Sequence, residues 1–220
     1  MIAVVYDLEL VKRFKKGQLS EIIEIGACKV DLTSLKIIDD IQIYMLPKNG
    51  YIPKSSRKFI NMTQDDVKSA IPFSDGMKKF IFWLQKEEDY FLCSWGKDDK
   101  VHFIDQCLRN NMKLKWFKNY NDIQPQIGKA LKQNTKNQLG LKNALHLANI
   151  EPVGQAHRGI DDTINTALLL IKYFDEVTLR TNMITEKELN LFESKRKKRR
   201  NRPHSKSEKQ IKHIHSTDKI

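Results

Sequence analysis

The amino-acid sequence predicts an α/β fold in which helices flank a central mixed sheet of five strands. Two observations predict it. Three strand-like runs follow one another with short gaps near the N-terminus, as in an antiparallel meander, and strand and helix patterns then alternate. The meander covers about 2–9, 21–31 and 36–46, and two parallel strands are expected at 90–95 and 118–123. Helices are expected at about 73–85, from 99, and at 124–132, 139–148 and 160–178.

Length and composition indicate one sizeable core and little more. The chain has 220 residues, of which 40% are hydrophobic. Its three cysteines are widely spaced, with no Cys-x-x-Cys pair, which favours reduced, structural thiols in a cytoplasmic protein over a zinc site or disulfides. No apolar run is long enough to span a membrane, and no signal peptide is expected.

Two acids, Asp7 and Glu9, lie in the apolar strand predicted at 2–9. Side chains alternate across a strand, so both acids point to the same face. Adjacent carboxylates on a buried strand repel each other and lose hydration unless a cation lies between them. A hard, oxygen-binding ion such as Mg²⁺ or Mn²⁺ suits that position. The alternative is a strand at the sheet edge with both acids solvated.

His157 and Asp162 lie where the last long helix is expected to begin, just after Gly159. On one continuous helix they would point about 140° apart. They converge only if His157 lies in the preceding loop and Asp162 in the first turn. A base on a mobile loop and a metal ligand on a rigid helix would suit proton transfer. Capping of the helix by Asp161 and Asp162 is the alternative.

A third acidic element follows the strand at 90–95. That strand runs into Gly96, and Asp98 and Asp99 then open an amphipathic helix. Read alone, the two aspartates are as well explained as helix caps. The conjunction of this element with the other two, in this order, favours a shared site.

The motifs resemble those of the DEDDh family of 3′-to-5′ exonucleases, which have the RNase H-like fold. The resemblance covers about residues 1–178, and the middle motif is most similar to the branch of the sporulation inhibitor KapD and the histone-mRNA exonucleases. Four ordered motifs make a strong signal where each alone is weak. They are Asp7-Leu8-Glu9, Glu21-Ile22-Ile23-Glu24-Ile25-Gly26-Ala27, Ser94-Trp95-Gly96-Lys97-Asp98-Asp99 and His157-Arg158-Gly159-Ile160-Asp161-Asp162.

The resemblance implies a role for each motif residue. Asp7 would bridge two Mg²⁺ or Mn²⁺ ions, Glu9 and Asp162 would complete the shell of one ion, and Asp99 would support the other. His157 would accept the proton of the attacking water, and a nucleoside 5′-monophosphate would leave the 3′ end of single-stranded RNA or DNA. The branch favours RNA. Asp99 is preferred over Asp98 because it follows Trp95 by four residues.

Several residues beside the motifs are predicted to contact nucleic acid. Leu10 stands where many relatives have Thr, a departure that could change how the terminal nucleotide is held. Basic residues follow the first strand directly and could contact the backbone of the incoming strand. Trp83 and His146 are expected to be structural. The predicted contact residues in the exonuclease domain are Leu8, Leu10, Lys12, Arg13 and Trp95.

The net charge of +12 is concentrated near the C-terminus. Residues 193–220 carry 11 basic and 3 acidic residues, a balance of +8, whereas the remainder has 28 basic and 24 acidic residues, a balance of +4. We therefore expect an exonuclease domain at 1–180, a helical extension or linker at 181–192, and a disordered basic tail at 193–220. The tail would bind nucleic acid through Lys195, Arg196, Lys197, Lys198, Arg199 and Arg200. A solvated tail and a nuclear import signal are the alternatives.

Two other function classes share this fold. A nucleic-acid-binding or regulatory protein that no longer cuts would lack one or more metal ligands, and here all four acids and the histidine are present. An RNase H-type or transposase-like endonuclease generally lacks the His-x-x-x-x-Asp element. Both observations favour the exonuclease.

Overall fold

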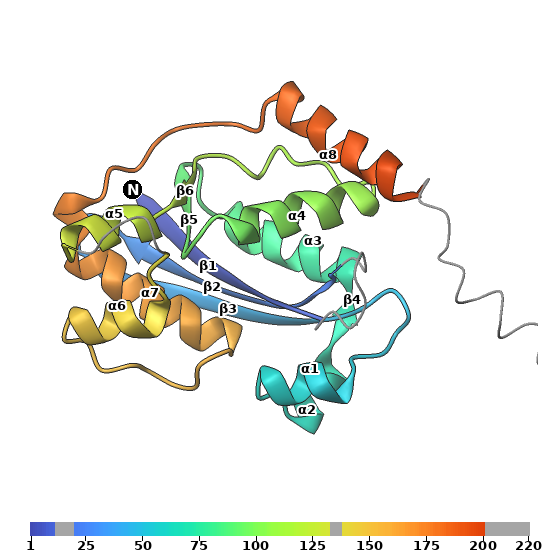
Figure 1. The fold of residues 1–220 in the computed structure, drawn as a ribbon, viewed down its shortest axis with the longest axis horizontal. Coiled ribbons are helices and arrows are strands. Elements are labelled where there is room, and N and C mark those ends of the chain that lie inside the picture. Colours follow the sequence, from blue (N-terminus) through green and yellow to red (C-terminus); the bar gives the residue numbers. More distant parts are fainter. Residues whose placement is uncertain (12–19, 133–137, 201–220) are drawn as a thin grey trace, which may run out of the picture. The chain divides into compact units, whose positions relative to one another are not determined.

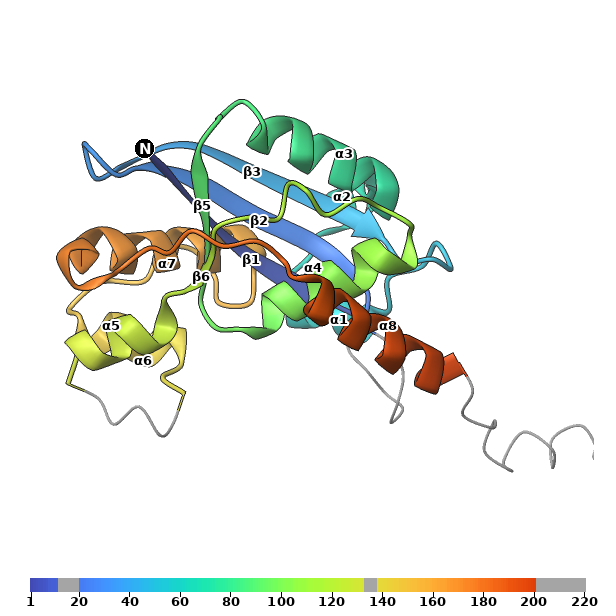
Figure 2. The ribbon, with the colours of Figure 1, turned by 90° about the horizontal axis from the view of Figure 1, so that it is seen from above.

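A six-stranded mixed sheet forms the centre of the unit Met1–Ile184 in the computed structural model, which describes residues 1–11, 20–132 and 138–200. The strand order is β4-β3-β2-β1-β5-β6, and the succession β3, β2, β1 can be followed in Figure 2. β1, β2 and β3 are antiparallel, whereas β5 runs parallel to β1, β6 to β5 and β4 to β3. The strands are β1 (Ile2–Leu10), β2 (Ile22–Asp31), β3 (Lys36–Leu46), β4 (Ile71–Pro72), β5 (Tyr90–Ser94) and β6 (Tyr120–Asp122).

The mixed α/β sheet is confirmed, but the prediction of five strands is wrong by one. The additional strand, β4, has two residues and pairs with the end of β3. So short a strand carries no alternation of polar and apolar residues by which a sequence pattern could show it.

Helices cover both faces of the sheet, with α3 and α4 on one side and α6 and α7 on the other (Figure 1). Two six-residue helices, α1 and α2, follow β3 and were not predicted. The helices of this unit are α1 (Lys54–Phe59), α2 (Gln64–Ser69), α3 (Phe73–Leu84), α4 (Asp98–Arg109), α5 (Gln124–Ala130), α6 (Leu141–Leu147) and α7 (Gly159–Lys172), with a 3₁₀ turn at Phe174–Glu176.

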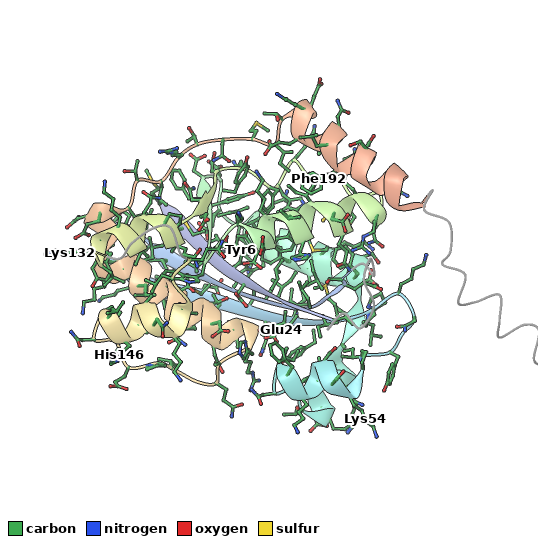
Figure 3. All side chains as sticks on the ribbon, viewed as in Figure 1. Tyr6, Glu24, Lys54, Lys132, His146 and Phe192 are labelled. Atoms are coloured by element: carbon green, nitrogen blue, oxygen red, sulfur yellow. The ribbon has the colours of Figure 1, made fainter. Side chains whose placement is uncertain are left out.

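The side chains of β1 alternate between two hydrophobic cores, one on each face of the sheet. The even-numbered side chains Val4, Tyr6 and Leu8 pack with the aromatic residues of α3 and α4, and the Tyr6 ring lies within this core (Figure 3). Ala3 and Val5 pack on the other face with residues of α5, α6 and α7. Asp7 and Glu9 continue this second face, so the fold directs both acids toward α7.

Of the two residues predicted to be structural, Trp83 lies in the core, whereas His146 lies on the surface. Trp83 is 6% exposed and packs in the core on the α3 side. His146 is exposed on α6, on the outside of the unit (Figure 3). All three cysteines are buried and unpaired, as predicted. In the part of the chain that the structure describes, no helix is both long and apolar enough to cross a membrane.

The second unit contains helix α8 (Glu186–Arg200). Residues 193–200, predicted to be part of a disordered tail, are helical instead. The helix begins with a reciprocal cap, in which the Glu188 backbone N–H donates to Thr185 Oγ1 at 3.2 Å and the Thr185 N–H donates to Glu188 Oε2 at 3.0 Å. This cap precedes a run rich in the good helix formers Glu, Lys, Leu and Arg, which explains the helix. Residues 201–220 lie outside the described part.

Candidate active site

Asp7 and Glu9 lie at the carboxyl end of β1, on the face covered by α7. Glu9 is 8% exposed, and burial together with the charges of Glu24, Asp162 and Asp99 raises its pKa to about 9. Burial and the charges of Asp99 and Glu9 likewise raise the pKa of Asp7 well above its usual range. Neighbouring negative charges therefore oppose ionisation of both groups. The alternative of a solvated edge strand is excluded, because β1 is flanked by β2 and β5.

The start of α7 brings His157 and Asp162 together, as predicted. His157 precedes the helix and has φ +64°, a left-handed conformation that turns the chain sharply. Asp162 lies in the first turn, and its Oδ2 accepts the His157 backbone N–H at 3.0 Å. Ligand atoms of Glu9, His157 and Asp162 all lie within 4.8 Å of one another. The loop and the first helical turn thus form one side of the site.

Asp99 completes the acidic set from α4. Since β1 and β5 are parallel, their carboxyl ends lie at the same edge of the sheet, and α4 begins there. Burial and the charges of Asp98 and Asp122 raise the pKa of Asp99 to about 7, and Asp99 in turn raises that of Asp7. Asp98 is exposed, whereas Asp99 is partly buried. Asp99 is therefore the less exposed of the two aspartates and the one whose charge acts on Asp7.

The residues present fit a divalent cation. Asp7, Glu9, Asp99 and Asp162 supply oxygen donors, and each has its pKa raised by burial. Carboxylates collected in a low-dielectric site are costly unless a positive charge joins them. A hard divalent ion such as Mg²⁺ or Mn²⁺ would supply that charge and prefers this kind of donor.

The exposed His157 side chain rests on a platform formed by α1 and the residues after it. The rings of Phe59 and His157 stack with centroids 4.5 Å apart. Asn61, in a left-handed conformation, donates from its side-chain amide to the Ala156 carbonyl at 3.3 Å. The platform therefore contacts both His157 and the residue before it. It was not predicted, because a six-residue helix shows too little periodicity.

The predicted nucleic-acid contacts have mixed outcomes. The Leu8 side chain is 6% exposed and belongs to the core, so only its backbone could contact a substrate. Leu10 is partly buried. Trp95 packs against the core on the α7 side, and its indole N–H donates to the Leu139 carbonyl at 3.0 Å, which gives it a structural role. Lys12 and Arg13 lie outside the described residues, and the side chains of 195–200 are not described.

Two acids near the site had no predicted role. Glu24 is fully buried on β2, and its Oε1 accepts the Ile160 backbone N–H at the start of α7. Asp122, at the end of β6, accepts the Gly96 N–H at 3.1 Å in the turn that leads to α4. The available signal for Glu24 was its position as a lone charge within the apolar run Ile22-Ile23-Glu24-Ile25-Gly26.

Comparison with known proteins shows the family to which the chain belongs. The sequence matches the exonuclease family (RNase_T) over residues 4–170. The Rattus norvegicus protein 3′-5′ exoribonuclease 1 is 29% identical over 173 residues, covering 74% of this chain and 50% of that protein. The Homo sapiens protein of the same name is 29% identical over 171 residues, covering 74% and 49%. This chain spans about half the length of these relatives.

Solved structures show the same fold. The nuclease domain of 3′hExo, described as a DEDDh family member bound to rAMP, has a TM-score of 0.74 at 25% identity, covering 84% of this chain and 97% of that domain. E. coli Exonuclease I in complex with a dT13 oligonucleotide has a TM-score of 0.61 at 13% identity, covering 78% and 40%, which shows the fold alone. The predicted RNase H-like, DEDDh-type resemblance is confirmed. Because the family match spans residues 4–170, most of its length, the chain belongs to the exonuclease family.

Proposed function

We propose that the protein is a metal-dependent 3′-to-5′ exonuclease that removes nucleoside 5′-monophosphates from single-stranded nucleic acid, with RNA preferred over DNA. The observation that carries this proposal is the approach of Glu9, His157 and Asp162 to within 4.8 Å, beside Asp7 and Asp99. The names of the relatives, 3′-5′ exoribonucleases, support the direction of cleavage and the preference for RNA.

Each side chain has a distinct part in the reaction. Two divalent ions, when bound, would stabilise the negative charge that develops on the phosphate during in-line displacement. Asp7 would hold both ions, Glu9 and Asp162 would complete the shell of one, and Asp99 would support the other. His157 is exposed at the rim, next to that set, and is free to take the proton of the attacking water.

A time course on a 5′-labelled single strand tests the proposal. Purified full-length chain with Mg²⁺ or Mn²⁺ should shorten the strand one nucleotide at a time, and chelator should stop the reaction. Asp7→Asn and His157→Ala should each remove most of the activity. Variants that degrade as fast as the wild type would refute the assignment.

Two controls separate the competing functions. A circular single strand should remain whole, whereas an endonuclease would open it. A chain that binds single strands but leaves every linear substrate intact would be a non-cleaving binding protein. Matched RNA, DNA and duplex substrates, compared side by side with each ion, give the preferred substrate and metal.

We also propose that the basic residues of 193–220 tether nucleic acid near the site. Lys and Arg side chains that neutralise phosphates release counterions, so they give salt-sensitive affinity without sequence preference. Removing residues 194–220 should weaken binding and flatten its salt dependence, by about 0.7 in the log–log slope for each phosphate that the segment neutralises on a single strand. Cleavage chemistry at saturating substrate should be unchanged. An unchanged salt slope would exclude the tether.

We further propose a cytoplasmic location for the chain. Its three cysteines are buried and form no disulfide with one another, which is consistent with this location, since disulfides are rare in that compartment. Fractionation of cells that produce the full-length chain should place it with cytoplasmic markers. Recovery with nuclei would favour the alternative in which the basic segment is an import signal.

A further inference from the structure

We propose that Glu24 is a positioning residue for this site, which holds the N-terminus of α7, and with it His157 and Asp162, against Asp7 and Glu9. The inference deepens the proposed exonuclease function and rests on it. Glu24 lies at the N-terminal end of α7, between that helix and the sheet (Figure 3).

The hydrogen bonds of Glu24 run from the sheet to the helix. Its Oε1 accepts the Gln42 side-chain amide on β3 at 2.7 Å and the Ile160 backbone N–H on α7 at 3.3 Å. The second of these bonds joins residues 136 positions apart in the chain. Ile160 lies between His157 and Asp162, so a constraint on its backbone constrains both. The first N–H groups of a helix lack partners within the helix, and a carboxylate is a favourable acceptor for them.

The register of the sheet places this hydrogen bond beside the acid pair. Glu24 is opposite Glu9, and Gly26 is opposite Asp7, in the antiparallel pairing of β1 and β2. Residues directly opposite each other share a face, so Glu24 points to the α7 side as Glu9 does. Glu24 therefore holds α7 at a position on β2 that is two residues from Gly26, the residue opposite Asp7.

The absence of a side chain at Gly26 allows the approach. A Cβ there would lie 2.2 Å from the Gly159 carbonyl carbon and 2.3 Å from the Ile160 nitrogen. The Thr163 hydroxyl donates to the Gly26 carbonyl at 3.0 Å, so the first turns of α7 rest directly on the strand backbone. Glu24 borders this region, since a Cβ on Gly159 would lie 3.1 Å from its Oε1.

The chemistry of Glu24 argues for a role beyond packing. Glu24 has no exposed surface, and its Oε2 is buried without a hydrogen-bond partner among the described residues. A buried carboxylate beside another acid is costly, and an apolar residue of similar size could fill the same space. Only an acceptor at this position satisfies the Ile160 N–H and fixes the helix end.

Three variants of the full-length chain test the proposal. Glu24→Ala removes the acceptor, and Glu24→Gln retains an oxygen of the same reach without the charge. Lys29→Met is the matched control, because Lys29 is a charged residue on the same strand, 2% exposed, and bonded to Glu87 away from the site. The readouts are the rise in Tm caused by Mn²⁺ and the Mn²⁺ concentration that gives half-maximal cleavage.

Glu24→Ala should need about 10- to 100-fold more Mn²⁺ in both measurements, as is typical when a group that orients a metal ligand is removed. Glu24→Gln should recover most of the Mn²⁺ response. Lys29→Met should lower Tm without changing the Mn²⁺ midpoint. A wild-type midpoint in Glu24→Ala, or an equal shift in Lys29→Met, would overturn the positioning role.

If Glu24→Ala does not fold, Glu24→Asp is the test, because it keeps the charge but shortens the side chain by one methylene. A wild-type Mn²⁺ midpoint in Glu24→Asp would overturn the positioning role. Failure of the exonuclease proposal has a different signature. The wild type would then show a Mn²⁺-induced rise in Tm but cut no substrate. The positioning role of Glu24 would in that case be tested by the Tm measurements alone. If Mn²⁺ does not change the Tm of the wild type, both the proposed exonuclease function and the positioning role of Glu24 would be overturned.

Discussion

Two helix N-termini bring acids to the carboxyl end of β1, and they are held in different ways. α4 follows a turn in which Gly96, at φ +108°, donates its N–H to Asp122, and the Ser94 hydroxyl donates to the Gly96 carbonyl at 2.8 Å. α7 instead rests directly on the backbone of β2 at Gly26, which has no side chain. Asp99 is thus placed by a turn built from side-chain hydrogen bonds, and Asp162 by a backbone approach that tolerates no added atom. We therefore expect the α4 side of the site to tolerate small changes in structure better than the α7 side.

The largest effect is expected at the start of α4, where two neighbouring aspartates differ in exposure and in proposed role. Asp98 is exposed, whereas Asp99 is partly buried and is the proposed metal ligand. Asp99→Asn should lower kcat by about 1000-fold, because removal of a metal-supporting carboxylate removes several kcal/mol of charge stabilisation. Asp98→Asn is the control, because Asp98 is exposed, and its rate should change by less than about threefold. Single-turnover cleavage measures both variants. Equal reductions in rate would contradict the choice of Asp99.

The close approach of α7 is tested by Gly26→Ala. Its Cβ cannot fit at 2.2 Å from Gly159, so the helix must shift, at a cost in the free energy of unfolding of about 1–3 kcal/mol. A displacement of the order of 1 Å should lower cleavage about 100-fold. Denaturant melts and cleavage assays measure the two effects. Gly128→Ala, on α5 with nothing within 4 Å of the added Cβ, should be neutral or stabilising. Near-wild-type activity of Gly26→Ala would show that the α7 side is adaptable after all.

The buried acids of the site should make the metal-free protein less stable as pH rises. The pKa of Glu9 is about 9 in the folded chain against an ordinary value near 4.5, so the folded state binds more protons than the unfolded state between these values. Stability is therefore reduced as pH increases through this window, by at most about 1.4 kcal/mol per pH unit for each such group.

Thermal melts in chelator should show Tm falling between pH 5 and pH 8, and Mg²⁺ at pH 8 should reverse the fall. Asp7→Asn in chelator should flatten the profile, since it removes one of the repelling charges. A Tm that rises with pH in chelator would contradict the raised pKa values at this site.

The smallest effect is expected at the platform under His157. Phe59→Ala removes the ring that stacks on the imidazole at 4.5 Å, an interaction worth about 0.5–1.5 kcal/mol. We expect kcat to fall by about two- to tenfold with the Mn²⁺ midpoint unchanged. Phe82→Ala, a substitution of an aromatic residue that is 71% exposed on α3, is the control and should leave kcat unchanged. A shifted Mn²⁺ midpoint in Phe59→Ala would show that the platform acts on the acids and not on the base alone.

The long elements were predictable because their apolar residues recur at the spacing of a strand or a helix. β1 to β3, α3, α4 and α7 show alternation or helical spacing over nine residues or more, and their predicted bounds are close to the observed ones with one exception. The helix predicted to reach residue 178 ends at Lys172, where a 3₁₀ turn at Phe174–Glu176 follows it. α1, α2 and β4 have six residues or fewer and show too little of any period. The helical part of the basic segment escapes prediction for another reason. A high charge indicates disorder, whereas the Thr185 and Glu188 cap that starts the helix lies upstream of the charged run.

The same distinction applies to the site. Asp7, Glu9, Asp99, His157 and Asp162 could be proposed from the sequence, because each stands in a local motif and the order of the motifs resembles that of a known family. Glu24 also stands in one of these motifs, yet its proposed role depends on a hydrogen bond to a helix 136 residues away. No local pattern contains such a partner. Phe59 was missed similarly, since its stacking on His157 exists only after folding.

The packing of α7 on Gly26 also has a consequence for synthesis. Thr163 and Gly26 are 137 residues apart, and β1 and β2 leave the ribosome long before the helix that packs on them. Until then Asp7 and Glu9 have no Asp162 or His157 beside them, because domains assemble only when their distant segments are available. A nascent chain is therefore expected to be unable to cut nucleic acid, its own messenger included, until nearly the whole nuclease unit has been made.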